Sequence, residues 1–405
     1  MAVTIFLSAT NILQIAAQLQ KNAEYASVLY LNLTNPQRNV EALPAHDMEE
    51  LRAAIQVNTT VTKLVISASW AEVRDERVNQ FFPSVIQELS HLRNLKILDV
   101  QLIQQINFDR IGPVLTHFLE NCKHLELLSF SRVEMGDLAS HLFRDWASVL
   151  AQRSTFKEFK LERCSFADSQ RNTPIMDPFL QALATSPSLE VVSLIGSENS
   201  IGIFSEQAFL RLCQSASLLE VHCHGWELPR IIAPLTSLFR EQQCCIRSLD
   251  IDFVKEKEDY LNLAELLELD TSIESLDFHG TVPLKEEEKL LIKVANALRC
   301  NRKLRCLVLS DHRMHSVKVM HAFLDMLTVN YSLQFLGLSY NRFDTEQDLS
   351  AKMDFYLKLN RFGRGRLLED EESSREDWLC KLVEVREDLS CLCYFLSKQP
   401  MLCQT

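Results

Sequence analysis

The sequence predicts an α/β solenoid, in which parallel strands line a concave face, helices cover the convex face, and further helices close the C-terminal end. Three observations predict this fold. A short pattern of apolar residues recurs along most of the 405-residue chain. The segments between its copies carry apolar residues at helical spacing. After residue 343 the pattern stops, and only the helical spacing continues.

The pattern is most regular in residues 333–343, LQFLGLSYNRF. Leu333, Leu336 and Leu338 are spaced L-x-x-L-x-L, and Asn341 follows three residues later. Leu336 and Leu338 are two residues apart, so they point to the same face of a short strand. One strand with one helix cannot bury that face alone, whereas stacked copies cover one another. We expect Asn341 to hydrogen-bond to backbone groups where the chain leaves the strand.

The pattern occurs eleven times, and each copy is anchored at the first apolar position of its strand. Consecutive anchors are 27 to 34 residues apart, which leaves room for a helix in every copy. Because helices are wider (~10 Å) than neighbouring strands are far apart (~4.8 Å), the stack should bend with its strands inside. The anchors are Val28, Val61, Leu95, Leu125, Phe156, Leu189, Leu218, Ile246, Ile273, Leu304 and Leu333.

This arrangement resembles the ribonuclease-inhibitor class of leucine-rich repeat proteins. The resemblance covers residues 25–343 and implies a horseshoe with one strand and one helix in each repeat. The sequence departs from the class in two respects. Most copies lack an asparagine equivalent to Asn341, and some strand positions hold a residue other than leucine, such as Cys223.

The two ends of the chain differ from the repeats. Residues 1–24 are expected to form an N-terminal cap with a short helix over ILQIAAQLQ. Residues 344–405 are expected to form a helical C-terminal cap. Its first helix is predicted over residues 344–368, and Gly363 and Gly365 should end it.

The rest of the C-terminal cap is predicted as an acidic loop over residues 369–377 and a single helix that begins at Trp378. That helix has one apolar face, formed by Leu382, Val385, Leu389, Leu392 and Leu396. The segments YLKLNRFGR and YFLSKQPMLC, together with Trp378, resemble the tail of leucine-rich repeat proteins from diatoms. The resemblance implies an interaction scaffold without assigned catalytic residues. The arginines of NRFGRGR are expected to pack against and cap the last repeat; the alternative is a phosphate site at a helix end.

Composition sets limits on the function. Hydrophobic residues make up 47% of the chain and charged residues 24%, which is a globular composition. The net charge of −12 argues against nucleic-acid binding and permits a basic protein partner. No apolar run reaches the ~18 residues of a membrane helix, and no signal-peptide pattern is present. The twelve cysteines form no C-x-x-C pair, so we expect free thiols in the cytoplasm, with the nucleus left open.

The candidate site is the polar face of the predicted strands. Polar positions between and after the buried residues face into the concavity, and equivalent positions of neighbouring copies should lie side by side. Clustered carboxylates beside a tryptophan would suit a basic segment of a protein partner. The expected partner-binding residues are Glu158, Glu162, Glu220, His222, His224, Trp226, Asp250, Asp252, Asp277, His279 and Asp311.

Two other interpretations of this face stay open. It is either a solvated surface without a ligand, or a metal site formed by His224, Asp252 and His279. No phosphate-binding loop, zinc-protease, nucleophile-elbow or dinucleotide motif occurs, so we expect no enzyme activity and no cofactor. The preferred function is a monomeric protein-interaction scaffold that binds neither nucleic acid nor membrane. The alternatives are a GTPase-activating regulator, with Arg132 and Arg163 as candidates, and a metal-dependent hydrolase.

Overall fold

The computed structural model divides into two compact units. Unit 1 comprises Met1–Leu228 with Cys244–Ile246, and unit 2 comprises Pro229–Gln243 with Arg247–Thr405. The residues that the structure describes are 3–6, 12–20, 27–33, 45–68, 76–101, 108–136, 139–166, 173–196, 202–225, 231–254, 257–269, 271–280, 284–310, 316–337, 347–369 and 373–403.

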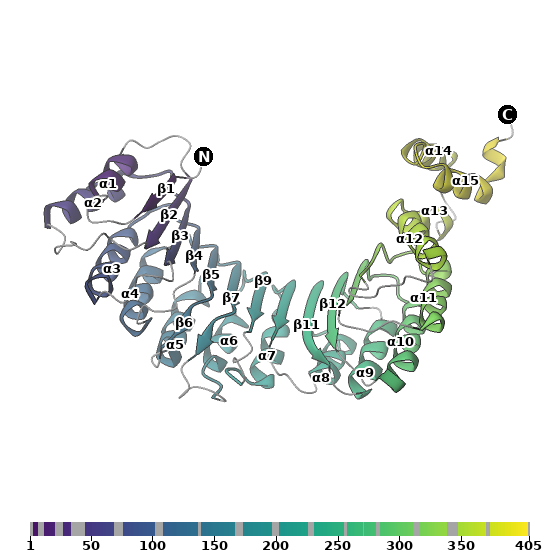
Figure 1. Ribbon diagram of the computed structural model, residues 1–405, viewed down its shortest axis with the longest axis horizontal. Helices are drawn as coiled ribbons and strands as arrows, with labels where there is room; N and C mark the ends of the chain where they lie inside the picture. Colours follow the sequence, from purple (N-terminus) through teal and green to yellow (C-terminus); the bar gives the residue numbers. More distant parts are fainter. Residues whose placement is uncertain are drawn as a thin grey trace. The chain divides into compact units, whose positions relative to one another are not determined.

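Unit 1 is a row of parallel strands in which each strand pairs with the next along the chain. The helices lie on one face of this sheet (Figure 1), and successive helices pack against each other. The strands in this row are β1 (Val3–Phe6), β2 (Val28–Leu33), β3 (Lys63–Ala68), β4 (Ile97–Gln101), β5 (Leu127–Ser131), β7 (Glu158–Glu162), β9 (Val191–Ile195) and β10 (Glu220–His224). Two short strands, β6 (Glu134–Met135) and β8 (Ser165–Phe166), form a separate pair.

One helix lies between each two consecutive strands of this row, so each strand and the next helix make one repeat. They are α1 (Ile12–Gln20), α2 (Ala45–Val57), α3 (Glu76–Leu89), α4 (Phe108–Asn121), α5 (Ala139–Leu150), α6 (Asp177–Leu183) and α7 (Glu206–Cys213).

Unit 2 continues the same alternation and ends in a helical cap. Its parallel strands are β11 (Ser248–Val254), β12 (Ser275–Gly280), β13 (Cys306–Ser310) and β14 (Phe335–Gly337). Its repeat helices are α8 (Ile232–Arg240), α9 (Lys257–Glu268), α10 (Leu284–Leu298) and α11 (Val317–Val329). The cap consists of α12 (Gln347–Arg361), α13 (Arg364–Glu369), α14 (Arg375–Glu384), α15 (Leu389–Lys398) and the short 3₁₀ helix η2 (Pro400–Cys403).

The apolar pattern accounts for the core of both units, which confirms the predicted leucine-rich repeat solenoid. In the copy that begins at Phe156, the anchor and the third and fifth residues after it, Phe159 and Leu161, are all fully buried. The first anchor is wrong by two residues, because Val28 pairs with Lys63 and not with Val61. The expected N-terminal helix is present as α1, but a strand that the sequence did not predict, β1, precedes it in the same sheet.

Asparagines hold the turns that lead from a helix into the next strand. The Asn330 side chain donates to the carbonyl oxygens of Leu298 and Asn301, at 2.6 and 2.9 Å. Its own oxygen accepts from the backbone N–H groups of Ser332 and Leu333. Since an unpaired buried backbone group is costly, these bonds fix the turn between helix and strand.

The same arrangement recurs at two other copies. Asn58 and Asn301 each accept from the N–H groups two and three residues later, and donate to a carbonyl of the preceding copy. These asparagines lie three residues before an anchor, at the start of the strand. Asn341, for which the sequence predicts a role at the end of the strand, lies outside the described residues.

The C-terminal cap closes the array through Asn360 and Arg364. Asn360 donates to the carbonyls of Asn330 and Leu333, at 3.0 and 2.7 Å. Arg364 is fully buried, and its Nη2 donates to the carbonyls of Leu327 and Asn330, at 2.7 and 2.9 Å. Burial lowers the pKa of this guanidinium. The expectation that NRFGRGR caps the last repeat is thus confirmed for Arg364.

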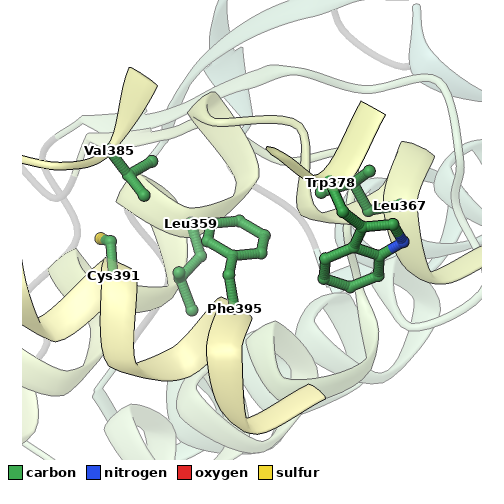
Figure 2. Packing of buried hydrophobic residues seen from close by; sticks show 6 residues of the cluster. All are labelled: Leu359, Leu367, Trp378, Val385, Cys391 and Phe395. Atoms are coloured by element: carbon green, nitrogen blue, oxygen red, sulfur yellow. The ribbon is translucent and has the colours of Figure 1, made fainter. Parts of the chain in front are cut away.

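Three tyrosine rings surround the Arg364 guanidinium, whose carbon lies 4.5 Å from the ring centre of Tyr331, 5.0 Å from that of Tyr356 and 6.0 Å from that of Tyr394. The rings offset part of the cost of burying the cation. Beyond them the cap has its own apolar core (Figure 2). The buried residues of this core are Leu359, Leu367, Trp378, Val385, Cys391 and Phe395.

Two predictions for the cap are wrong in detail. Gly363 has a φ of 76° and follows the end of α12 as expected, but Gly365 lies inside α13. The single helix from Trp378 is two helices, because α14 ends at Glu384 and α15 begins at Leu389 after Asp388 caps it. The apolar spacing continues across the break, since Val385 is buried between the two helices' ends. No helix within the described ranges is long and apolar enough to cross a membrane.

Candidate interaction surface

The sheet face away from the helices, called here the open face, carries the side chains two, four and six residues after each anchor. On β7 these are Glu158, Lys160 and Glu162, which are half-buried, while Phe159 and Leu161 between them are buried. The alternation follows from the period of two residues in a strand. The predicted residues Glu158, Glu162, Glu220, His222 and His224 therefore all lie on the open face of unit 1.

Charged side chains on this face pair locally. The Lys160 ammonium is 2.7 Å from the Glu158 carboxylate on the same strand. The His222 ring nitrogen Nε2 lies 3.8 Å from Glu220, two residues before it. Farther along the sheet, Lys63 lies 4.0 Å from Asp99. Since exposed ion pairs contribute only ~0–1 kcal/mol, these contacts leave the carboxylates able to exchange partners.

Strand β9 lies between the two acidic strands, and the sequence-based site omits it. Val191 pairs in register with Glu158 on one side and Glu220 on the other. Ile195 likewise lies between Glu162 and His224. Both apolar side chains are half-buried on the open face. Because neighbouring strands are ~4.8 Å apart, Glu158 and Glu220 are about 10 Å apart, with an apolar strip between them.

Further apolar side chains lie on the open face before β7. In the row that contains Glu158 and Val191, Leu127 of β5 and Ile97 of β4 are also half-buried on the open face. The available signal in the sequence was the presence of Ile97, Leu127 and Val191 two residues after an anchor, where five other copies hold a charged residue or serine: Lys63, Glu158, Glu220, Ser248 and Ser275. Apolar side chains at open-face positions distinguish this part of unit 1 from a purely polar surface.

Strands β5, β7 and β10 end in a shared backbone turn. Arg132, Arg163 and Gly225 occupy equivalent positions with φ of 55°, 53° and 71°. A Cβ on Gly196, at the equivalent position of β9, would lie 2.4 Å from the Gly225 carbonyl oxygen, so only glycine fits there. Arg132 and Arg163 are exposed at adjacent strand ends. Both side chains are accessible to a partner, as a GTPase-activating role requires. That role stays a hypothesis.

The open face of unit 2 carries the predicted pair Asp250 and Asp277, which are in register on β11 and β12 and half-buried. The same row continues with Val308 of β13 and Gly337 of β14. The neighbouring row ends at Phe335, which is 52% exposed. Acidic and apolar side chains thus adjoin on unit 2 as well.

The possible metal site predicted from His224, Asp252 and His279 is only partly described. Asp252 lies where the register between β11 and β12 shifts, so the structure does not pair it with His279. The side chains of Asp252 and His279, and the whole of Trp226 and Asp311, lie outside the described residues. No group of three histidine, cysteine, aspartate or glutamate side chains that could hold a metal occurs in the described part of the chain.

The cysteines divide by burial. Burial raises the pKa of Cys122, Cys164 and Cys244 to about 12, which keeps these thiols protonated at neutral pH. Cys213 and Cys223 are buried in the core as small apolar side chains. Cys306 is half-buried on the open face, where it is in register with Phe335.

The strand–helix repeats define a leucine-rich-repeat-type solenoid, a class whose members generally serve as protein-interaction scaffolds and are typically not enzymes. No protein-family model matches the chain, and no curated protein sequence matches it either. Among solved structures, the C-terminal domain of tropomodulin from Caenorhabditis elegans is similar. It has 16% identity and a TM-score of 0.28, and the match covers 34% of this chain and 78% of that one. The fold assignment rests on the strand and helix arrangement described above.

Proposed function

We propose that the protein is an interaction scaffold of the ribonuclease-inhibitor-like class, which binds a protein partner through the open face of unit 1. The observation that carries the proposal is the apolar strip of Val191 and Ile195 between the acidic side chains of β7 and β10. Binding sites for proteins combine a desolvated apolar centre with a polar rim. This face offers both on neighbouring strands.

The chemistry of the rim favours a basic partner. Glu158, Glu162 and Glu220 border the strip, and the whole chain carries a net charge of −12. A partner segment with an apolar side chain flanked by lysine or arginine would place its apolar group over Val191 and Ile195. Its cations could then reach the carboxylates on either side.

The cysteine content supports a reducing location for this function. Eleven cysteines among the described residues are free thiols, and disulfides are rare in reducing compartments. We therefore propose a cytoplasmic location, which imaging of a fluorescently tagged chain would test.

Affinity capture with quantitative mass spectrometry tests the function. Two variants alter the open face: Val191→Asp/Ile195→Asp removes the apolar strip, and Glu158→Lys/Glu220→Lys reverses the rim. Two matched controls alter exposed positions elsewhere: Val57→Asp at the end of α2 and Glu241→Lys after α8. Circular dichroism confirms the fold of all four variants before capture.

The expected result is that one set of proteins is captured by the wild type and both controls and is lost with both open-face variants. Captured proteins should also elute with rising salt, because part of the attraction is electrostatic. Capture of the same proteins by all five chains would refute the proposal for this face.

A further inference from the structure

The last strand of the sheet in unit 2, β14, has a free edge. Strand β13 pairs with one side of β14, and no described strand pairs with its other side. Proteins normally protect such edges with charged residues, proline or a bulge. β14 has none of these, since it consists of Phe335, Leu336 and Gly337 and its register with β13 is unbroken. An edge of this kind is a template for pairing with a further strand.

A backbone pattern that joins the strands of unit 2 stops at this edge. The carbonyl one residue after an anchor accepts hydrogen bonds from two consecutive N–H groups of the next copy. The carbonyls of Arg247, Glu274 and Arg305 each accept such a pair, at donor–acceptor distances of 2.7 to 3.0 Å. The equivalent carbonyl of the last copy is that of Gln334, and no backbone N–H group in the described part of the chain donates to it. The start of one more strand would supply this pair of donors.

Alternation along the strand assigns the other backbone groups of the edge. The Phe335 N–H donates to the carbonyl of Arg305, just before β13. Backbone groups of successive residues in a strand point to opposite sides, so the N–H and the carbonyl of Leu336 point away from β13. The edge therefore offers the carbonyls of Gln334 and Leu336 as acceptors and the Leu336 N–H as a donor. An extended segment that runs parallel to β14 can pair with all of these groups.

The side chains along this edge are apolar on both faces of the sheet. Leu336 occupies the core position, and its equivalents in the three preceding copies are at most 1% exposed, whereas Leu336 itself is only half-buried. On the open face, Phe335 is 52% exposed. A Cβ on Gly337 would lie 3.1 Å from the Phe335 ring and 3.2 Å from Val308, so these two side chains flank a position without a side chain. A strand beside β14 would therefore bury apolar side chains on both of its faces.

We infer that the free edge of β14 binds an extended segment of another protein, which adds to the sheet as one further parallel strand. The backbone of this segment donates two consecutive N–H groups to Gln334, so it has no proline at those two positions. Its side chains opposite Phe335 and Leu336 are apolar. The inference concerns unit 2 and does not depend on the function proposed for the open face of unit 1.

The occupant is a single extended segment and not a second repeat array. Helix α12 packs against α11, as one repeat helix packs against the next, and also against α13 and α15 of the cap. A second array would bring a helix behind each of its strands. Its first helix, α1, would need the place beside α12 that α13 and α15 occupy. A lone segment needs only the edge of β14.

The probe is a synthetic, fluorescently labelled peptide with the sequence of residues 303–310, KLRCLVLS, and the change Cys306→Ser. Within the array this segment already pairs with an edge of the same kind, because Arg305 and Cys306 donate their N–H groups to the Glu274 carbonyl. A control peptide carries N-methyl groups on the amides of its third and fourth residues, which removes these two donors and keeps every side chain. Fluorescence anisotropy measures the binding of both peptides to the full chain.

The unmodified peptide should bind saturably to one site in the full chain. The N-methylated peptide should bind at least ~10-fold more weakly, because the Gln334 carbonyl then lacks its donors. Phe335→Gln should also weaken binding of the unmodified peptide at least ~10-fold, since it removes an exposed apolar side chain without changing the charge. The matched control Val317→Gln, at a site on α11 that is 45% exposed, should leave the dissociation constant unchanged.

Hydrogen exchange locates the site without any substitution. Bound peptide should slow exchange in residues 334–337, because the outward N–H of Leu336 gains an acceptor. Slower exchange there, together with the expected effects of N-methylation and Phe335→Gln, would support the inference. Equal binding of the two peptides, or slower exchange only elsewhere in the chain, would overturn it.

Two further outcomes would also overturn the inference. One is the absence of any binding at peptide concentrations up to about 1 mM, the weak end of the usual affinity range. The other is a concentration-dependent dimer of the unliganded chain in sedimentation velocity that Phe335→Gln abolishes, since the edge would then belong to a second copy. Neither outcome bears on the open face of unit 1, which the capture experiment tests separately.

Discussion

Replacing Arg364 by alanine is expected to loosen the C-terminal cap from the last repeat. The side chain is fully buried and donates two hydrogen bonds, to the carbonyls of Leu327 and Asn330. Hydrogen bonds from a charged group contribute ~1.5–3 kcal/mol each, and the cost of burying the guanidinium offsets part of this. Truncation also leaves a cavity, and such cavities cost ~2–5 kcal/mol in protein cores. We expect a net loss of about 3 kcal/mol.

The assay is native-state hydrogen exchange of peptides from α11 and α12, because a repeat array does not unfold in one step. Since 1.4 kcal/mol corresponds to a factor of ten, exchange in these helices should become about 100-fold faster in Arg364→Ala. Arg364→Met fills most of the same volume without the hydrogen bonds and should cost roughly half as much.

The matched control is Arg361→Ala in the same NRFGRGR motif, because Arg361 is exposed. Exposed substitutions of this kind usually change stability by less than ~0.5 kcal/mol. If Arg361→Ala and Arg364→Ala exchange at the same rates, the reasoning about the buried guanidinium is refuted.

Three further outcomes are expected. Gly363→Ala should destabilise the cap by about 1 kcal/mol, because φ is 76° at this residue. Gly365→Ala within α13 should be neutral or stabilising. Urea unfolding of the two variants measures the sign of each change in the free energy of unfolding. The hydrogen bond from Lys358 lowers the pKa of Asp388 from 3.8 to about 2. The ionised Asp388 carboxylate therefore stabilises the folded cap fully above pH 3.8, and this stabilisation is lost as the pH falls to about 2. The difference in Tm between wild type and Asp388→Asn should therefore shrink over that range. Iodoacetamide should label the exposed cysteines of the native chain and spare the buried ones, as peptide mass spectrometry would show. The exposed cysteines are Cys245, Cys300, Cys380 and Cys393, and the buried ones with a raised pKa include Cys122, Cys164, Cys213 and Cys244.

The strands could be predicted from the sequence because burial imposes a strict period on them. The unit that looks most regular, at Leu333, is nevertheless only partly covered. Leu336 of β14 is only half-buried and Phe335 is 52% exposed. Strand β14 is the last of its row, so a neighbouring copy covers one side of it only. Sequence regularity shows that a copy exists, and its position in the array decides how deeply it is buried.

The break between α14 and α15 could not be found from apolar spacing. Two helices that share one core keep the same spacing of apolar residues as one long helix, provided that the turn between them is short. The signal that was present is Asp388, whose carboxylate accepts from the Cys391 N–H and caps α15. An aspartate three residues before a cysteine is too common to decide this without the structure.

The candidate site was predicted in part. Alternation within a strand placed Glu158 and Glu220 on the open face, as the structure shows. It did not suggest that Val191 belongs to the same surface, because an apolar residue in a strand is normally assigned to the core. The pairing partners of the carboxylates were also beyond prediction, since Lys160 meets Glu158 through side-chain conformations that the sequence does not specify.

The structure explains how the array ends. Asn360 lies 30 residues after Asn330, which is one repeat, and it bonds to the carbonyls of Asn330 and Leu333 much as Asn330 bonds to those of the copy before. The anchor of the next strand would fall at position 363, three residues after the asparagine. That position is occupied by Gly363, which has a φ of 76°. The Arg364 side chain next to it donates to the carbonyl oxygens of Leu327 and Asn330 in the previous copy. Helix α12 is therefore a repeat helix whose strand has been replaced by a turn, and the helices after that turn are free to present a surface that no inner repeat could expose.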